Sequence, residues 1–177
     1  TNGGFETKFD GWTVAADLVA GEYGWPRVLS LEFDETVAKD GRRSARISFG
    51  GGQDPDFYHI TQVVLVAPAT RYRVSYSVKT EALQSKSLPL VAVGDADQSP
   101  IAFYKAPELA SLTSGTNDWT RVTFDFTTPQ VTRRLVLRIS RSGSGPESYQ
   151  PDRFGPIRGT VWFDDICLSE LQGASPP

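Results

Sequence analysis

The sequence predicts an all-β protein, a two-sheet antiparallel β-sandwich arranged as a jelly roll. Segments in which apolar and polar residues alternate recur along most of the 177 residues, and clusters of Gly, Pro, Asp and Ser separate them. About eight to ten such segments, each with one polar face, suit two packed sheets of about four or five strands. The only stretch that suits a helical turn is "APELASL" at residues 106–112.

The alternation is clearest in "RYRVSYSVKTE" at residues 71–81, where Tyr72, Val74, Tyr76 and Val78 share one face of a strand. Polar residues occupy the positions between them, so this strand is expected to have one buried and one exposed face. In chain order, the predicted strands cover residues 27–37, 44–50, 58–68, 71–81, 88–94, 119–129, 133–143 and 159–168. The predicted loops lie at 50–56, 94–100, 114–118 and 142–156.

The composition suits one domain, predicted at residues 1–171, followed by a linker-like tail at 172–177. Eighteen Lys and Arg are scattered among 21 Asp and Glu, and the net charge of −3 argues against a nucleic-acid partner. The longest apolar run is the five residues 63–67, too short to span a membrane. The sequence lacks methionine, which leads us to expect a module attached to other domains of a longer chain.

Catalytic and redox chemistry find little support in the sequence. Cys167 is the single cysteine and His59 the single histidine, which excludes an internal disulfide and a His-rich metal site. In "LEFDETV", Glu32 and Asp34 share a strand face, but Thr36 stands where a glycosidase motif would need its third acid. We therefore expect these acids to form an exposed strand face, and we expect no glycosidase or lyase activity.

Two adjacent acids interrupt the apolar strand "GTVWFDDICL" at residues 159–168. Strand alternation places Asp164 and Asp165 on opposite faces. If Ile166 and Leu168 face the core, Asp164 lies on the covered side. A covered carboxylate needs a cation or several hydrogen-bond donors, and the residues alone leave both possibilities open.

Several stretches occur together in an order that resembles a known family. They are "NGGFE" at 2–6, "GW" at 11–12, "GRRSARISF" at 41–49, the Gln of "ITQVVLVAP" at 62, "TRYRVSYSVKT" at 70–80, "NDWTRVTFDFTTP" at 117–129 and "VWFDDICL" at 161–168. With these segments the chain resembles the jelly-roll carbohydrate-binding modules of families four, nine and twenty-two, within the galactose-binding-like superfamily.

The resemblance implies a structural calcium ion where the N-terminal segment meets the last strand. The implied ligands are the carboxylates of Glu6 and Asp164, with main-chain carbonyls from Gly4 and from the turn at 39–43, which includes Asp40. Mixed carboxylate and carbonyl oxygens are the ligands that Ca²⁺ prefers.

The resemblance also implies a sugar-binding cleft or loop cluster. Two expected aromatic platforms are absent, because His59 and Ser77 stand where some relatives carry Trp. The candidate ligand-binding residues are Tyr58, His59, Gln62, Lys79, Arg138, Trp25 and Tyr149.

These observations predict a non-catalytic carbohydrate-binding module of a larger exported or surface protein. The expected partner is a poly- or oligosaccharide, and the expected location is extracellular or at the cell surface. The alternative is a structural or protein-interaction sandwich of the same fold with no sugar site.

Overall fold

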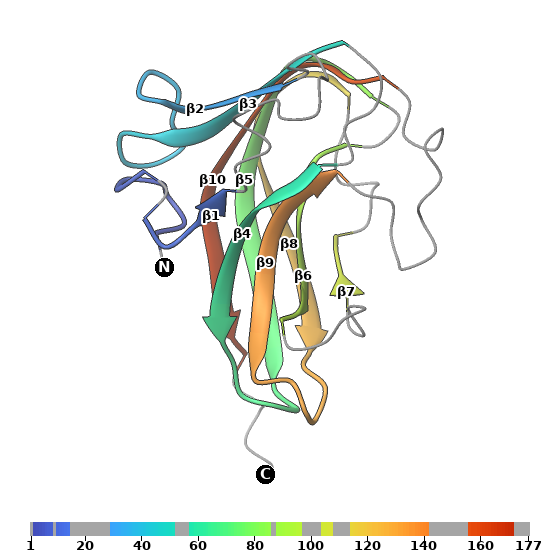
Figure 1. The fold of residues 1–177 in the computed structure, drawn as a ribbon. Coiled ribbons are helices and arrows are strands. Elements are labelled where there is room, and N and C mark those ends of the chain that lie inside the picture. Colours follow the sequence, from blue (N-terminus) through green and yellow to red (C-terminus); the bar gives the residue numbers. More distant parts are fainter. Residues whose placement is uncertain are drawn as a thin grey trace.

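Ten strands form two five-stranded antiparallel sheets in the part of the chain that the computed structural model describes, which is residues 2–8, 10–14, 29–51, 57–85, 88–96, 104–107, 114–141 and 156–171. The first sheet has the order β1-β4-β9-β6-β7 and the second has the order β2-β3-β10-β5-β8 (Figure 1). We call them the β4/β9 sheet and the β5/β10 sheet. The predicted β-sandwich class is confirmed.

Most strand bounds follow the alternation in the sequence, but residues 115–118, predicted as part of a loop, belong to a strand. The strands are β1 (Thr13–Val14), β2 (Leu29–Asp34), β3 (Ser44–Gly50), β4 (Phe57–Leu65), β5 (Arg71–Gln84), β6 (Leu90–Asp95), β7 (Tyr104–Lys105), β8 (Gly115–Thr127), β9 (Arg134–Arg141) and β10 (Arg158–Glu170). No helix occurs among the described residues, and residues 108–112 of the predicted helical turn lie outside them. Within the same residues, no helix is long and apolar enough to cross a membrane.

The core lies between the two sheets and is filled by the apolar face of each strand. On β5, Tyr72, Val74, Tyr76 and Val78 are all buried, as the alternation predicted, but Ser75 and Ser77 between them are buried as well, so the expected exposed face is wrong there. The β4/β9 sheet contributes residues such as Ile139 to the same core. Alternation decides the fold here because a strand shows its even and odd positions to opposite sides.

The N-terminal segment joins the two sheets at one edge of the sandwich. Its Phe5 is fully buried, and the Phe5 ring lies 5.4 Å from the ring of Trp12. β1 extends the β4/β9 sheet, while the carbonyl of Gly3 accepts a hydrogen bond of 3.0 Å from the amide of Ile166 on β10. This segment therefore continues the β5/β10 sheet at the end of β10 where pairing with β3 stops at Phe163.

A β-bulge interrupts β10 beside this contact. Asp164 pairs with Ser77 and Cys167 pairs with Ser75, so β10 has one more residue than β5 across this interval. Asp165 has a φ of 53°, the left-handed conformation that the extra residue of a bulge often adopts. The bulge allows both Phe163 and Ile166 to reach the core although strict alternation would separate them.

Candidate metal site and binding face

Asp164 is fully buried and is surrounded by main-chain amides. Its Oδ2 accepts hydrogen bonds from the amides of Lys39 at 2.7 Å and Asp40 at 3.2 Å, and its Oδ1 accepts one from Asp165 at 2.8 Å. Burial raises the pKa of the Asp164 carboxyl, although these three donors act in the opposite direction. The prediction that Asp164 is covered is confirmed.

The cover over Asp164 differs from the one that alternation suggested. Asp164 lies on the same side of β10 as Trp162, and the core residue Phe163 lies on the other side. The bulge between Asp164 and Ile166 lets Ile166 reach the core although Asp164, two residues earlier, does not face it. The amides of the 39–40 turn donate to the carboxylate, and Gly4 of the N-terminal segment lies beside it. Counting every second residue back from Ile166 across the bulge therefore gives the wrong face for Asp164. No feature of the sequence "FDDI" predicts that a bulge occurs there.

Glu6 lies on the other side of the same turn. Its Oε1 accepts hydrogen bonds from the amides of Arg42 at 2.8 Å and Arg43 at 3.0 Å. The Arg42 amide is the main cause of a lowered pKa for Glu6, since it donates to the charged carboxylate. Gly41 allows this approach because a Cβ at that position would lie 2.3 Å from Oε1.

Gly4 lies between the two acids. A Cβ built on Gly4 would lie 3.6 Å from Oδ1 of Asp164 and 4.0 Å from Cγ of Glu6. The carboxylate of Asp40 accepts a hydrogen bond from the Gly41 amide at 2.9 Å, so Asp40 faces Asp164 with its main chain. The family resemblance implied that Gly4, Glu6, Asp40 and Asp164 lie together, and they do lie together in the structure.

This donor set suits a hard cation with mixed oxygen ligands. Both hydrogen bonds to Glu6 are made by Oε1, and those to Asp164 occupy only part of the capacity of its two oxygens. Among the described residues, no three His, Cys, Asp or Glu side chains gather as a metal site, so main-chain carbonyls would have to complete the shell. The residues present fit Ca²⁺, which binds such mixtures.

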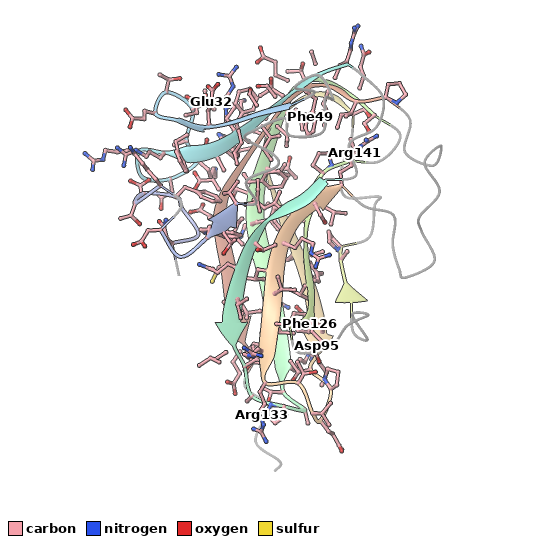
Figure 2. The ribbon with its side chains drawn as sticks, in the orientation of Figure 1. Glu32, Phe49, Asp95, Phe126, Arg133 and Arg141 are labelled. Atoms are coloured by element: carbon pink, nitrogen blue, oxygen red, sulfur yellow. The ribbon has the colours of Figure 1, made fainter. Side chains whose placement is uncertain are left out.

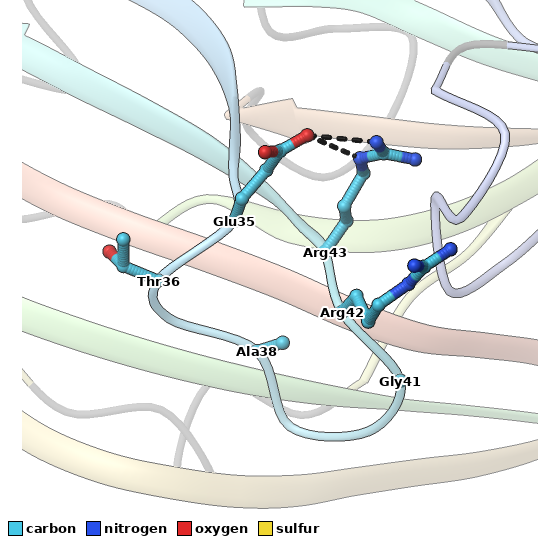
Figure 3. Close-up of a pocket in the computed structure, with 6 residues that line it drawn as sticks. All are labelled: Glu35, Thr36, Ala38, Gly41, Arg42 and Arg43. Carbon is cyan, nitrogen blue, oxygen red and sulfur yellow. Dashed lines mark hydrogen bonds and ion pairs between the residues drawn. The ribbon is translucent and has the colours of Figure 1, made fainter.

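A pocket of about 430 Å³ adjoins this turn on the β2–β3 connection (Figure 3). The side chain of Arg43 lines it, and its Nε donates to Oε1 of Glu35 at 2.8 Å (Figure 3). Its Nη1 donates to the carbonyl of Glu6 at 2.6 Å. The polar groups that line the pocket thus hold the connection in shape. The lining residues are Glu35, Thr36, Ala38, Gly41, Arg42 and Arg43.

Asp34 shapes the start of the same connection. Its Oδ1 accepts hydrogen bonds from the Thr36 amide at 2.8 Å, the Thr36 hydroxyl at 2.6 Å and the Val37 amide at 3.0 Å. Its Oδ2 accepts one from the Trp162 indole at 2.9 Å. Burial alone would raise the pKa of Asp34, but the side-chain hydrogen bonds from Thr36 and Trp162 and the amide donors lower it to about 2. These contacts make Asp34 a turn-forming residue.

The candidate ligand-binding residues do not gather on one face. Arg138 pairs with Thr61 on the outer face of the β4/β9 sheet, whereas Lys79 belongs to the β5/β10 sheet. There, Nζ of Lys79 contacts Oδ1 of Asp118 at 3.0 Å. Lys79 and Arg138, two of the candidate ligand-binding residues, therefore cannot line one cleft, because alternation gives the two faces of each strand but does not say to which sheet a strand belongs.

Gln62 also requires a correction. It pairs with the core residue Leu137, is only 7% exposed, and donates from its Nε2 to the carbonyl of Gly11 at 3.0 Å. Its side chain therefore points inward and anchors the N-terminal segment. It does not lie on the outer face with Thr61 and Arg138.

The outer face of the β4/β9 sheet carries two features that sequence reasoning missed. Val63 is 58% exposed and Leu65 is 83% exposed, although both belong to the longest apolar run in the sequence. They lie opposite Val136 and Arg134 in the register of β4 and β9. The position of Gln62 between Thr61 and Val63 was the available signal, since an inward Gln places its two neighbours outward.

Four further candidates lie in parts that the structure describes incompletely or not at all. The backbone of Tyr58 and His59 belongs to β4, while their side chains are outside the described part. Trp25 and Tyr149 lie wholly outside the described residues. Their roles stay predictions.

A family model described as "Carbohydrate binding domain" matches residues 1–145 of the chain. Among curated proteins, the tRNA(Glu)-specific nuclease WapA of Bacillus subtilis subsp. natto is 28% identical over 177 residues, which is 98% of this chain and 7% of that protein. The tRNA nuclease WapA of Bacillus subtilis strain 168 is 27% identical over the same shares. The chain thus spans 7% of the length of these curated relatives.

Solved structures of carbohydrate-binding modules share the fold. One described as "CBM4 structure and function" has a TM-score of 0.58 at 18% identity, covering 97% of this chain and 99% of that one. The C-terminal family 22 carbohydrate binding module of Clostridium thermocellum Xyn10B has a TM-score of 0.60 at 11% identity, covering 94% and 90%. At these identities the likeness is one of fold.

Proposed function

Because the chain belongs to the carbohydrate-binding domain family, whose model it matches over residues 1–145, we propose that it is a non-catalytic polysaccharide-binding module of a longer exported or cell-surface protein. The observation that carries this proposal is the outer face of the β4/β9 sheet. Exposed aliphatic side chains lie there beside hydroxyl and guanidinium donors, at Val63, Thr61 and Arg138. Sugar rings offer C–H faces to the first kind of group and hydroxyls to the second.

The non-catalytic role is supported by how the acids of the chain are used. Asp34 is held by four hydrogen bonds, and Asp125 contacts Arg71 at 3.0 Å and Arg73 at 2.7 Å. Glycoside hydrolysis needs two carboxyl groups that converge on one bond, one of them with a raised pKa. The described acids with lowered pKa values serve turns and strand pairs instead, and Asp164, whose pKa is raised by burial, is fully buried against main-chain amides.

Affinity gel electrophoresis against a panel of soluble neutral and acidic polysaccharides tests the proposed function. We expect slower migration in at least one polysaccharide gel than in a polysaccharide-free gel, and a fall in that retardation for Val63→Asp. Leu83→Ile, a buried change, serves as the matched variant with an unaltered surface. Equal mobility in every gel would refute sugar binding.

A second candidate function, a protein-interaction sandwich of the same fold, is favoured by one specific observation. The three large hydrophobic side chains that stand exposed among the described residues, Val63, Leu65 and Val131, are all aliphatic, and none is aromatic. Flat aromatic rings are the usual platforms for sugars, whereas aliphatic patches suit protein partners as well. A protein that gives no retardation in any gel would favour this second function.

We further propose that Glu6 and Asp164 hold a structural Ca²⁺ ion with main-chain carbonyls of the Gly4 segment and the 39–43 turn. The ion would neutralise the buried Asp164 and fix the N-terminal segment to β10, where Gly3 already contacts Ile166. Its role would be mechanical, since the site lies beside the β2–β3 connection and away from the outer face of the β4/β9 sheet.

Scanning calorimetry with calcium and with a chelator tests the metal proposal. A ligand that binds only the folded state at about 100 times its Kd stabilises by about 2.7 kcal/mol. For a domain of this size, that raises Tm by about 5–11 °C. Glu6→Gln should abolish the calcium-dependent rise while Glu81→Gln, an exposed change on β5, should keep it. Superimposable melting curves for verified metal-free and calcium-loaded protein would refute the site.

A further inference from the structure

The outer face of the β4/β9 sheet combines three cross-strand pairs. Thr61 lies opposite Arg138, Val63 opposite Val136, and Leu65 opposite Arg134. These pairs follow one another along β4 and β9, so polar and apolar groups form one continuous strip. In Figure 1, β4 and β9 lie in front of β10 and β5, so this face is turned toward the viewer.

The charges on this strip are of one sign. Among the described side chains of β1, β4, β6 and β9, the outward positions provide two arginines, Arg134 and Arg138, and no carboxylate. Arg133, which precedes β9, is exposed at the lower end of the sheet (Figure 2). This is notable in a chain whose net charge is −3.

The β5/β10 sheet carries both acids and cations. Its cations face acids across neighbouring strands, as in Lys79 with Asp118 at 3.0 Å and Arg73 with Asp125 at 2.7 Å. Among the described strands, the acids that point away from the core all belong to the β5/β10 sheet, because Asp95 of β6 is buried and accepts a hydrogen bond from Thr132. The separation gives the β4/β9 face a more positive local field than the chain as a whole.

We propose that the β4/β9 face binds an acidic polysaccharide whose sugar rings carry carboxylates. This inference rests on the proposed function and names the class of glycan. Val63 and Val136 would contact the C–H faces of the rings, while the guanidinium groups of Arg138 and Arg134 donate to the carboxylates. Each guanidinium has five N–H donors, so it can serve a ligand together with a protein partner.

The spacing of the two arginines suits a polymer. They lie four positions apart on β9, which corresponds to about 13 Å along the strand. A chain with acidic groups at regular intervals could engage both at once, whereas a single acidic sugar could reach only one of them. A polymer that contacts both arginines at once binds more tightly than one that contacts either alone, without any additional contact at each arginine.

Polygalacturonate and its methyl ester provide a matched pair of ligands, because they share a backbone and differ in the charge of the carboxyl group. We expect the protein to bind polygalacturonate at least about tenfold more tightly than the fully methyl-esterified polymer, as measured by calorimetry or by affinity electrophoresis. Raising the salt concentration from about 0.05 M to about 0.5 M should weaken the first interaction and leave the second nearly unchanged.

Two double variants that each remove two positive charges locate the binding face. Arg138→Gln with Arg134→Gln should lower the affinity for polygalacturonate about tenfold or more, while Arg71→Gln with Arg73→Gln on β5 should change it less than about twofold. Far-UV circular dichroism and Tm of each variant show whether it is folded. A loss of equal size in both variants would overturn the assignment to this face.

Three outcomes are separable. Binding to neutral glycans that equals or exceeds binding to polygalacturonate would overturn the acidic class and leave the proposed function standing. Binding to polyglutamate as tight as binding to polygalacturonate would also overturn the acidic-polysaccharide assignment, because the face would then recognise charge without sugar. Absence of binding to every glycan, neutral or acidic, would overturn both the inference and the proposed function.

Discussion

The carboxylate of Asp34 offers a quantitative test of how the β2–β3 connection is held. Its oxygens accept hydrogen bonds of 2.6–3.0 Å from Thr36, Val37 and Trp162, and its pKa lies at about 2 where an ordinary Asp has 3.8. A lowering of this size corresponds to about 2 kcal/mol of stability. Because the folded pKa is the lower one, this contribution is fully present above pH 4 and is lost as the pH falls toward 2.

The substitution Asp34→Asn should imitate the protonated residue. The amide keeps one acceptor for Thr36 and Val37 but presents an NH₂ group to the indole N–H of Trp162, whose side chain is buried. At pH 7 we expect a loss of about 2 kcal/mol, which lowers Tm by about 4–8 °C. At pH 2 the native protein and the variant should have nearly equal stability.

Urea denaturation followed by circular dichroism at pH 7, 4 and 2 measures both curves. Glu32→Gln is the matched control, since Glu32 lies two residues earlier on the same strand, is exposed, and has only a 3.8 Å contact with Arg46. It should change stability by less than about 0.5 kcal/mol at each pH. A constant gap between Asp34→Asn and the native protein across the whole pH range would refute the reasoning.

Two further predictions concern the turn and the core. Gly41→Ala should destabilise the folded protein by about 1–3 kcal/mol, since φ is 63° and the new Cβ would meet Oε1 of Glu6. In the control Gly115→Ala, φ is 101° and open space surrounds the new Cβ, so this variant has a backbone cost without a clash. Equal losses for the two would argue against the clash. Phe163→Ala, at a fully buried position, should cost about 3–5 kcal/mol in urea denaturation, whereas Leu65→Ala at an 83% exposed position should cost less than about 0.5 kcal/mol. Similar losses at these two positions would contradict the assignment of inner and outer faces.

The candidate metal site shows which of its features the local sequence pattern predicts and which it does not. Alternation in "GTVWFDDICL" predicted that one of two adjacent acids is covered, and Asp164 is fully buried. The cover itself comes from Lys39, Asp40 and the N-terminal segment, which are distant in sequence. The bulge at Asp165 could not be foreseen, because it depends on how β5 and β10 are paired.

The sequence by itself determined the all-β class, most of the strands and the buried face of strands such as β3, because alternation is a local property that burial imposes on each strand. Only the tertiary structure decided which strands share a sheet. That pairing separated Lys79 from Arg138, turned Gln62 inward and left Val63 and Leu65 exposed. Sheet membership depends on contacts between segments far apart in the chain, and strand periodicity carries no record of them.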